Sequence, residues 1–173
     1  SVITISTPLY IATLTNRSGG SFIDYIIKDD DVDKRKYIGG YDADGQFKPD
    51  LPVSIVMSSA TRCMPCLAGY DEGYDEYVYL NQPFTLVSPL EKDTLFLGSA
   101  DRLELTYKLI GLSAGELITK TVEFSGNSYI SNHVFSVNNS LDLPGNIELV
   151  WDGGLRPAEE KVDEDVQYGS GII

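Results

Sequence analysis

Hydrophobic and polar residues alternate along much of the chain, and the cleanest alternation runs over residues 103–109, within a predicted strand at residues 103–110. Leu105, Tyr107 and Leu109 share one side of an extended chain, while the residues between them are polar. Successive side chains of a strand point to opposite faces of a sheet, so this pattern predicts a strand with one buried and one solvated face.

The same reasoning predicts strands wherever β-branched and aromatic residues alternate or run together. These segments are residues 2–14 with a break at Pro8, 21–28, 53–59, 76–80, 84–87, 94–98, 117–124, 129–137 and 147–151. Turn sequences separate them, and in the second half of the chain the strands recur about every ten residues. This rhythm predicts an all-β fold, a single jelly roll or β-sandwich barrel of about eight antiparallel strands.

One predicted strand, residues 21–28, is apolar on nearly both faces. Phe22 lies on one face, and Tyr25 and Ile27 lie on the other. A strand of this kind is either buried on both faces or placed at an interface. We therefore treat Phe22, Tyr25 and Ile27 as candidate interface residues.

The end of the chain differs in composition from the rest, which predicts a β-barrel domain at residues 1–154 and an acidic tail or arm at residues 155–173. Carboxylates crowd residues 159–165. Two interpretations are open: a short helix over residues 157–166 with acidic residues near its start, or an extended arm that orders on a partner.

The 173 residues carry a formal net charge of -13. This charge repels phosphate backbones, so we expect no nucleic acid partner, and it disfavours docking on an anionic membrane through a basic patch. The charge itself has two interpretations. It keeps an aggregation-prone β protein in solution, or it forms an acidic face for a basic partner or for cations.

The two cysteines form a Cys-x-x-Cys motif at Cys63 and Cys66. In redox proteins the first thiol of such a motif has its pKa lowered by a helix N-terminus, whereas here acidic residues follow and no helix is predicted. Structural zinc sites need four ligands, and the chain adds only His133 to the two thiols. A local disulfide or a pair of buried thiols is the first interpretation, an intersubunit disulfide or a metal site the second, and a redox site the third.

Residues 69–76 repeat the tetrad Gly-Tyr-Asp-Glu in tandem, and a Tyr-Val-Tyr segment follows. The plain interpretation is a loop that leads into a strand. Tyrosine is enriched in interface cores, so Tyr70, Tyr74, Tyr77 and Tyr79 are also candidate contact residues. The same tyrosines beside carboxylates would suit stacking on a sugar, and the carboxylates would suit calcium.

We predict no catalytic residue, no metal site and no cofactor. His133 is the single histidine and lies inside a predicted strand, where a hydrogen-bonded structural histidine is expected. No Gly-x-Ser-x-Gly elbow occurs. The Asp-Ala-Asp-Gly segment at residues 42–45 resembles part of a calcium loop, but Gly40 and Leu51 occupy the first and twelfth positions, so a turn is predicted there.

Several global features together resemble the small major capsid protein of tailless, membrane-containing icosahedral phages of the Thermus and haloarchaeal type. They are the length of 173 residues, the mass of 19.0 kDa, the strands between Val2 and Trp151, turns such as Pro144-Gly145-Asn146, and the acidic segment 159–165. The resemblance covers the whole chain. It implies a single vertical jelly roll that acts as a structural virion protein located in the capsid.

The resemblance also implies partners. The subunit would self-associate, with a homodimer expected, and would tile an icosahedral shell with a larger capsid protein over an internal virion membrane. Exposed edge strands offer a physical route to such assembly, because they can pair with a neighbouring sheet.

Two other hypotheses come from different classes of protein. The first is a carbohydrate-binding or adhesive β-sandwich that uses Trp151 and the exposed tyrosines as a stacking platform. The second is an enzyme with a carboxylate pair, whose separation is set by the fold and not by sequence spacing. We expect a protein that is not an enzyme.

Overall fold

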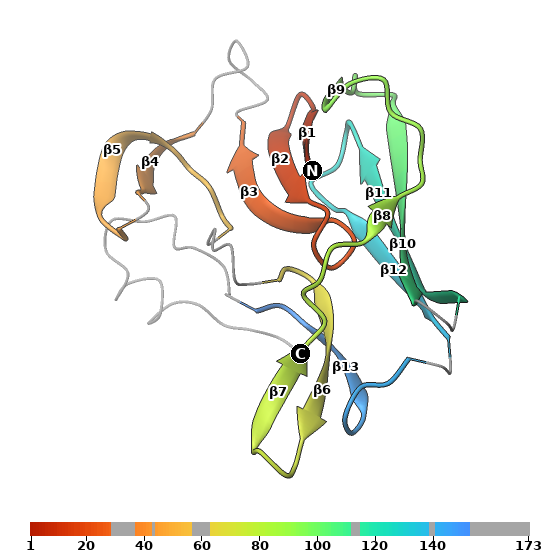
Figure 1. Cartoon of the computed structure of the whole chain (residues 1–173). Helices are drawn as coiled ribbons and strands as arrows, with labels where there is room; N and C mark the ends of the chain where they lie inside the picture. Colours follow the sequence, from red (N-terminus) through yellow and green to blue (C-terminus); the bar gives the residue numbers. More distant parts are fainter. Residues whose placement is uncertain (29–36, 43, 57–62, 112–114, 139–140, 153–173) are drawn as a thin grey trace.

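The structure is a computed structural model, and it describes residues 1–28, 37–42, 44–56, 63–111, 115–138 and 141–152. These residues form thirteen strands and no helix, which confirms the predicted all-β fold (Figure 1). The strands are β1 (Val2–Ser6), β2 (Tyr10–Thr15), β3 (Ser21–Ile27), β4 (Ile38–Tyr41), β5 (Phe47–Pro52), β6 (Cys66–Asp71), β7 (Glu76–Tyr79), β8 (Thr85–Leu86), β9 (Thr94–Phe96), β10 (Arg102–Gly111), β11 (Gly115–Ser125), β12 (Asn132–Val137) and β13 (Ile147–Val150). Within the described part of the chain, no helix has the length and apolar character needed to cross a membrane.

The first four-stranded sheet has the order β3-β2-β1-β9. Its first three strands are antiparallel neighbours, whereas β9 lies parallel to β1. A tight turn joins β1 to β2, in which Thr7 Oγ1 accepts hydrogen bonds from the backbone N–H of Leu9 (3.1 Å) and of Tyr10 (3.0 Å). This turn falls at Pro8, where the sequence predicts a break because proline has no N–H for the ladder.

The second four-stranded sheet has the order β12-β11-β10-β8, and all its pairings are antiparallel. The long hairpin of β10 and β11 forms its centre. Between β8 and β10 the chain crosses to the first sheet to form β9, so the two sheets are joined by strands that alternate between them (Figure 1).

The hydrophobic core lies where these two sheets face each other. Leu105, Tyr107 and Leu109 of β10 are buried, as their alternation predicts. Across the core the ring of Phe22 meets that of Phe124 edge-on, with 6.2 Å between centroids. Each buried large apolar side chain contributes about 1.5–3 kcal/mol relative to an exposed one, so this packing is the main source of stability.

The jelly-roll connectivity stays a prediction. In the order β9-β1-β2-β3, the later strand β9 lies beside β1, the first of three consecutive strands, and this is the strand order of a Greek key. The strands of a Greek key are antiparallel, however, whereas β9 is parallel to β1. The second sheet joins β10, β11 and β12 in sequence order. The described strands therefore support a two-sheet sandwich, to which a three-stranded and a two-stranded sheet are added.

Phe22 and Tyr25 lie in the core, with exposed fractions of 2% and 5%, and are thus removed from the candidate interface. Ile27 is partly buried. The prediction that Phe22 and Tyr25 lie on opposite faces is wrong. A register shift between β2 and β3 pairs Phe22 with Leu14 and Tyr25 with Ala12, on one side of the sheet.

β3 lies at the edge of its sheet. At this edge Phe22 N–H donates to the carbonyl of Met64 (2.8 Å) and Ile27 N–H donates to that of Val53 (3.2 Å).

Some predicted segments fall partly or wholly outside the described residues. In the predicted strand 53–59, Val53 and Val56 are buried and Ser54 forms an isolated bridge to Ile26. Residues 57–62 lie outside the description, as do the whole of the predicted tail 155–173 and the helix considered at residues 157–166.

Candidate functional site

A three-stranded sheet of order β13-β6-β7 extends from one end of the sandwich (Figure 1). β6 is its central strand and pairs antiparallel with β13 on one side and with β7 on the other. We call it the projecting sheet. All four residues of β7 and three of the four residues of β13 are exposed, so side chains on both faces of this sheet meet solvent.

The register divides the projecting sheet into two faces, because residues paired across antiparallel strands point to the same side. Tyr70 pairs with Tyr77, while Ala68 pairs with Tyr79 and with Glu148. Tyr70, Tyr77, Tyr79 and Glu148 therefore share one side, which we call the tyrosine face.

The other side carries Val78, Ile147 and Leu149, and we call it the aliphatic face. Gly69 of β6 pairs with both Val78 and Ile147, which places these two side chains on one side of the sheet. Their exposed fractions are 38% for Val78, 43% for Ile147 and 61% for Leu149. A cluster of exposed aliphatic side chains in one small sheet is typical of a contact surface.

The side chains of the tyrosine face are already ordered by contacts with one another. The rings of Tyr70 and Tyr77 lie 5.2 Å apart at 62°, and those of Tyr77 and Tyr79 lie 6.1 Å apart at 40°. The Tyr77 hydroxyl donates to Glu148 Oε2 (3.1 Å), and the Tyr70 hydroxyl donates to Asp75 Oδ1. These carboxylate acceptors raise the pKa of both hydroxyls, so both tyrosines stay neutral donors.

A cavity of about 300 Å³ opens on the tyrosine face. Its lining consists of aromatic rings, carboxylates, an amide and a turn glycine: Tyr70, Glu72, Tyr77, Gly145, Asn146 and Glu148. The cavity thus combines apolar walls with hydrogen-bond acceptors, which is the composition of sites that hold small polar groups.

The tandem tetrad builds the tip of the hairpin formed by β6 and β7. Asp71 ends β6, and its Oδ1 accepts hydrogen bonds from the N–H of Gly73 (2.8 Å) and of Tyr74 (3.3 Å). Asp75 takes a positive φ of 55° that completes the turn. Tyr74 is 80% exposed at this tip and lies apart from the other predicted tyrosines, which the structure brings together.

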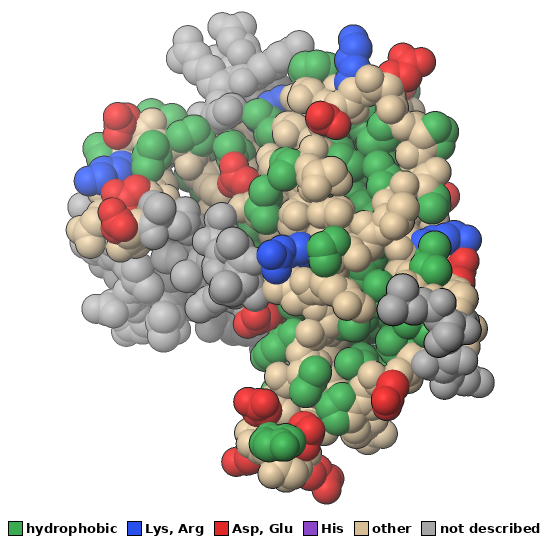
Figure 2. Space-filling view, in the orientation of Figure 1, with side chains coloured by type: hydrophobic (Ala, Val, Ile, Leu, Met, Phe, Trp, Pro, Cys, Tyr) green, Lys and Arg blue, Asp and Glu red, His purple; other side chains and the backbone are tan. Residues whose placement is uncertain are grey.

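All charged side chains of the projecting sheet are negative. Residues 66–79 and 147–150 contain no Lys or Arg. They contain the carboxylates Asp71, Glu72, Asp75, Glu76 and Glu148. Figure 2 shows acidic side chains gathered around the hairpin tip at the bottom of the view.

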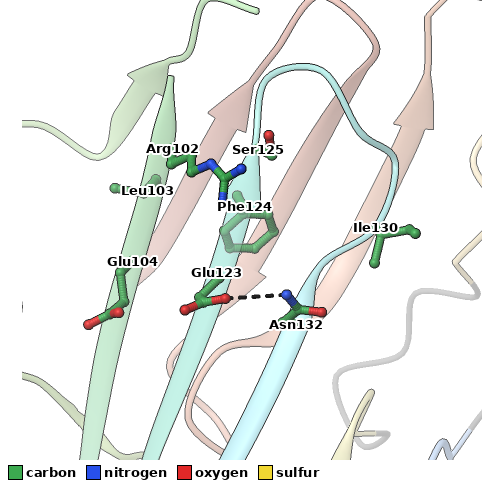
Figure 3. A pocket seen from close by; sticks show the side chains of 8 residues that line it. All are labelled: Arg102, Leu103, Glu104, Glu123, Phe124, Ser125, Ile130 and Asn132. Atoms are coloured by element: carbon green, nitrogen blue, oxygen red, sulfur yellow. Dashed lines mark hydrogen bonds between the residues drawn. The ribbon is translucent and has the colours of Figure 1, made fainter. Parts of the chain in front are cut away.

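A second cavity, of about 290 Å³, lies on the outer side of the second sheet (Figure 3). Glu104 and Glu123 pair directly across β10 and β11 and both line it, and Glu123 Oε2 accepts a hydrogen bond from Asn132 Nδ2 (3.2 Å). Arg102 and Ile130 line the same cavity. Like charges directly opposite one another in a sheet repel, so this carboxylate pair is unfavourable for the fold.

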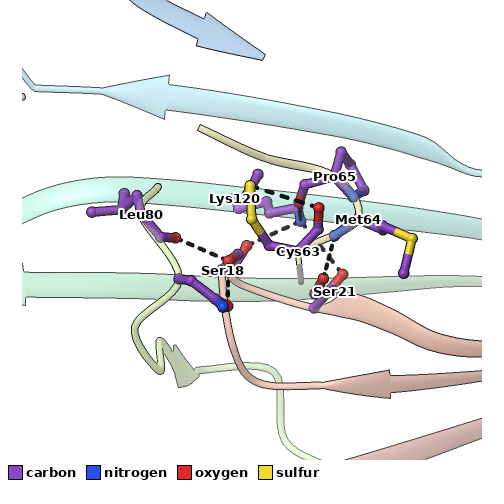
Figure 4. Close-up of a disulfide and its surroundings, with 10 residues drawn as sticks. Ser18, Ser21, Cys63, Met64, Pro65, Leu80 and Lys120 are labelled. Atoms are coloured by element: carbon purple, nitrogen blue, oxygen red, sulfur yellow. Dashed lines mark hydrogen bonds between the residues drawn. A yellow bond between two sulfur atoms is a disulfide. The ribbon is translucent and has the colours of Figure 1, made fainter. Parts of the chain in front are cut away.

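Cys63 and Cys66 form a disulfide that is buried at the base of the projecting sheet (Figure 4). The segment between them is held to β3, because Met64 N–H donates to Ser21 Oγ (2.5 Å). Cys63 also accepts a hydrogen bond through its carbonyl from the N–H of Asp152 (3.0 Å). The cysteines thus anchor β6 to the sandwich.

Lys120 lies beside this disulfide and is fully buried (Figure 4). Its Nζ donates to the carbonyls of Ser18 (3.0 Å), Pro65 (3.1 Å) and Gly20 (3.4 Å), and it lies 4.7 Å from the centre of the Phe135 ring. Burial lowers the pKa of Lys120 to about 7. The lysine joins β11, the loop before β3 and the disulfide segment.

His133 of β12 packs edge-on against Phe22, with ring centroids 5.4 Å apart. One ring nitrogen, Nε2, lies 3.1 Å from Ser131 Oγ, whereas Nδ1 is buried and has no hydrogen-bond partner among the described residues. Burial, together with the charge of Lys120, lowers the pKa of His133 to about 3. The histidine is therefore neutral at ordinary pH, and it packs against the core through Phe22.

The described residues contain no group of three or more His, Cys, Asp or Glu side chains arranged to hold a metal ion. At the predicted turn, Asp42 Oδ1 accepts hydrogen bonds from the N–H of Asp44 (3.0 Å) and of Gln46 (2.8 Å). Its oxygen is thus used by the turn, as the incomplete calcium-loop pattern predicts.

Comparison of this chain with protein families, with curated proteins and with solved structures finds no match.

Proposed function

We propose that this chain is a structural virion protein, a small major capsid subunit that self-associates and tiles an icosahedral shell together with a larger capsid protein. The observation that carries the proposal is the projecting sheet, which leaves the sandwich with exposed side chains on both faces. Its outer strand β13 offers backbone groups to a neighbouring subunit.

The aliphatic face is the surface best suited to contact between identical copies. Val78, Ile147 and Leu149 carry no charge, and the two carboxylates on this side, Asp71 and Glu76, pair with each other at the tip end of β6 and β7. Two copies can therefore bring the three aliphatic side chains together while these carboxylates stay at the margin of the contact. The tyrosine face, by contrast, would bring Glu72 and Glu148 of each copy together. Burial of apolar surface contributes about 25 cal/mol for each Å² removed from water, and this term favours pairing of the aliphatic faces.

Self-association is tested by multi-angle light scattering of the full chain over a range of concentrations. The wild-type protein is expected to form a defined oligomer, and Leu149→Asn is expected to shift it toward the monomer. Ile110→Asn serves as a matched control, because Ile110 of β10 is also 61% exposed but lies outside the projecting sheet.

Two results would contradict the proposal. One is a wild-type protein that stays monomeric at every concentration. The other is an oligomer that Ile110→Asn weakens as much as Leu149→Asn does, because the contact would then not be specific to the aliphatic face.

A second candidate function, carbohydrate binding, is favoured by the cavity between Tyr70 and Tyr77, which offers rings beside acceptor groups. Against it, neighbouring rings are inclined by 62° and 40°, so they do not form a flat platform for a sugar ring. A glycan array probed with the labelled protein distinguishes the two functions, since a monomer that binds sugars would favour this second candidate.

A further inference from the structure

We propose that the tyrosine face binds an arginine side chain from an extended basic segment of a partner protein. This goes beyond the proposed self-association, because it uses the opposite face of the projecting sheet and a chemically different partner. The argument rests on the charge of the sheet, on its cavity and on the position of β7 as an outer strand among the described strands of the sheet.

Charge complementarity selects a cationic occupant. The projecting sheet contains five carboxylates and no basic residue, and Glu72 and Glu148 reach the cavity itself. The rest of the chain adds to the attraction, because the net charge is -13. A basic segment is thus drawn to this face, and an acidic one is repelled.

The geometry of the cavity selects arginine over lysine. A guanidinium group is planar, stacks on aromatic rings and donates hydrogen bonds to carboxylates from a fixed fork. Here the rings of Tyr70 and Tyr77 line the same cavity as the carboxylates of Glu72 and Glu148. One guanidinium can therefore lie against a ring and bond to a carboxylate at once.

The cavity is ordered before a ligand enters. The bond from the Tyr77 hydroxyl to Glu148 Oε2 fixes both side chains, and the bond from Tyr70 to Asp75 fixes the second ring. A carboxylate has several acceptor positions, so Glu148 can keep Tyr77 as a donor and still accept from arginine. Side chains already held in place lose less entropy on binding.

We expect the partner segment to be extended, because β7 is an outer strand with which an extended segment can pair. β7 lies at the end of the strand order β13-β6-β7, next to the tyrosine face that it helps to form. An added strand would gain main-chain hydrogen bonds to β7 and place alternate side chains over the tyrosine face.

The inference is tested by fluorescence anisotropy with a labelled peptide in which arginine alternates with serine. Peptides with lysine or with neutral citrulline in place of arginine are the ligand controls. We expect the arginine peptide to bind most tightly and the citrulline peptide most weakly. Glu148→Gln and Tyr77→Leu should each weaken arginine-peptide binding by about tenfold, because each removes one partner of the guanidinium.

The protein control is Glu104→Gln, which removes one exposed negative charge from the outer side of the sandwich. It should leave binding within about twofold of wild type, since a distant surface charge contributes little at moderate salt. Circular dichroism shows whether each variant is folded. Equal binding by Glu148→Gln, Tyr77→Leu and Glu104→Gln, or equal binding of the arginine and lysine peptides, would overturn the inference.

The two proposals fail separately. If Leu149→Asn abolishes self-association and still binds the arginine peptide, both stand. A wild-type monomer that binds the peptide through Glu148 would contradict only the capsid proposal. An oligomer that does not bind the peptide would contradict only the proposed arginine site. A neutral glycan that binds through Tyr77 would likewise replace arginine as the occupant.

Discussion

Lys120 shows how a single residue departs from a pattern that otherwise predicts the fold. The alternation in β11 assigns its position to the core, because Ile118 and Val122 on either side of it are fully buried. The ammonium group is accommodated there because three backbone carbonyls accept its three N–H donors. All three acceptors are neutral carbonyls, so desolvation lowers the pKa of Lys120.

This lowered pKa predicts a pH dependence of stability. Between pH about 7 and 10.5 the unfolded chain keeps its proton on Lys120, whereas the folded protein releases it. The free energy of unfolding should therefore rise with pH in this range, by up to about 1.4 kcal/mol per pH unit. Urea unfolding of the wild type and of Lys120→Met at several pH values measures this difference, and the variant should lack the rise.

The rise in the free energy of unfolding should end at alkaline pH. Burial raises the pKa of Tyr107 to about 12 from its usual value of 10, so the folded state keeps a proton that the unfolded chain loses. Stability should therefore fall above pH about 10 in the wild type and in Lys120→Met alike. If the free energy of unfolding changes equally with pH in both proteins below pH 10, the hydrogen bonds from Lys120 to the three carbonyls offset its desolvation.

At the scale of elements, the projecting sheet depends on close contact between β6 and the loop before β13. A Cβ atom added at Gly69 would lie 2.1 Å from the backbone oxygen of Pro144, so one of the two segments would have to move. Gly69→Ala should therefore lower the free energy of unfolding by about 1–3 kcal/mol, the usual cost of overpacking.

Gly73→Ala is the control for this variant. Its added Cβ would lie 3.2 Å from Asp71 Oδ1, an exposed side-chain oxygen that has to shift by only a few tenths of an ångström. We expect Gly73→Ala to be nearly neutral in urea unfolding. Equal stability of the two variants would mean that the loop carrying Pro144 is not packed on β6 as the structure places it.

Strands with strong alternation could be predicted from the sequence, and strands without it could not. β10, β11 and β12 follow the predicted segments closely, because apolar and polar residues alternate along them. β4, β5 and β6 were missed since they contain Gly39, Pro49 and Gly69, residue types that are depleted in strands. Their pairing depends on neighbouring strands, which a local pattern does not contain.

The candidate site was predicted only in part for a similar reason. Tyr70, Tyr77 and Tyr79 stand out as a cluster in the sequence, but Glu148 is 71 residues from Tyr77 and joins it only through the β13–β6–β7 register. Residues 147–151 were predicted as a strand, but the sequence did not show that Ile147 and Leu149 are exposed. For β3 the sequence left open whether the strand is buried or lies at an interface, and the structure places Phe22 and Tyr25 in the core.

At the scale of the whole molecule, the projecting sheet extends from one end of the sandwich, and we propose that it is the contact surface of the molecule. The disulfide and the hydrogen bonds of Lys120 both lie where β6 leaves the sandwich (Figure 4). These contacts hold the base of the projecting sheet against the sandwich. Its aliphatic face suits a second copy, and its tyrosine face suits a basic partner. This division is the basis of the assembly role that we propose.

The most direct test of that role is amide hydrogen exchange of the wild-type protein at a dilute and at a concentrated condition. We predict slower exchange at high concentration in β7 and β13, because these strands become covered when copies meet through the aliphatic face. Exchange in β12, an edge of the sandwich, should not change. Protection confined to β12, or no change in β7 and β13 while oligomers form, would contradict the account.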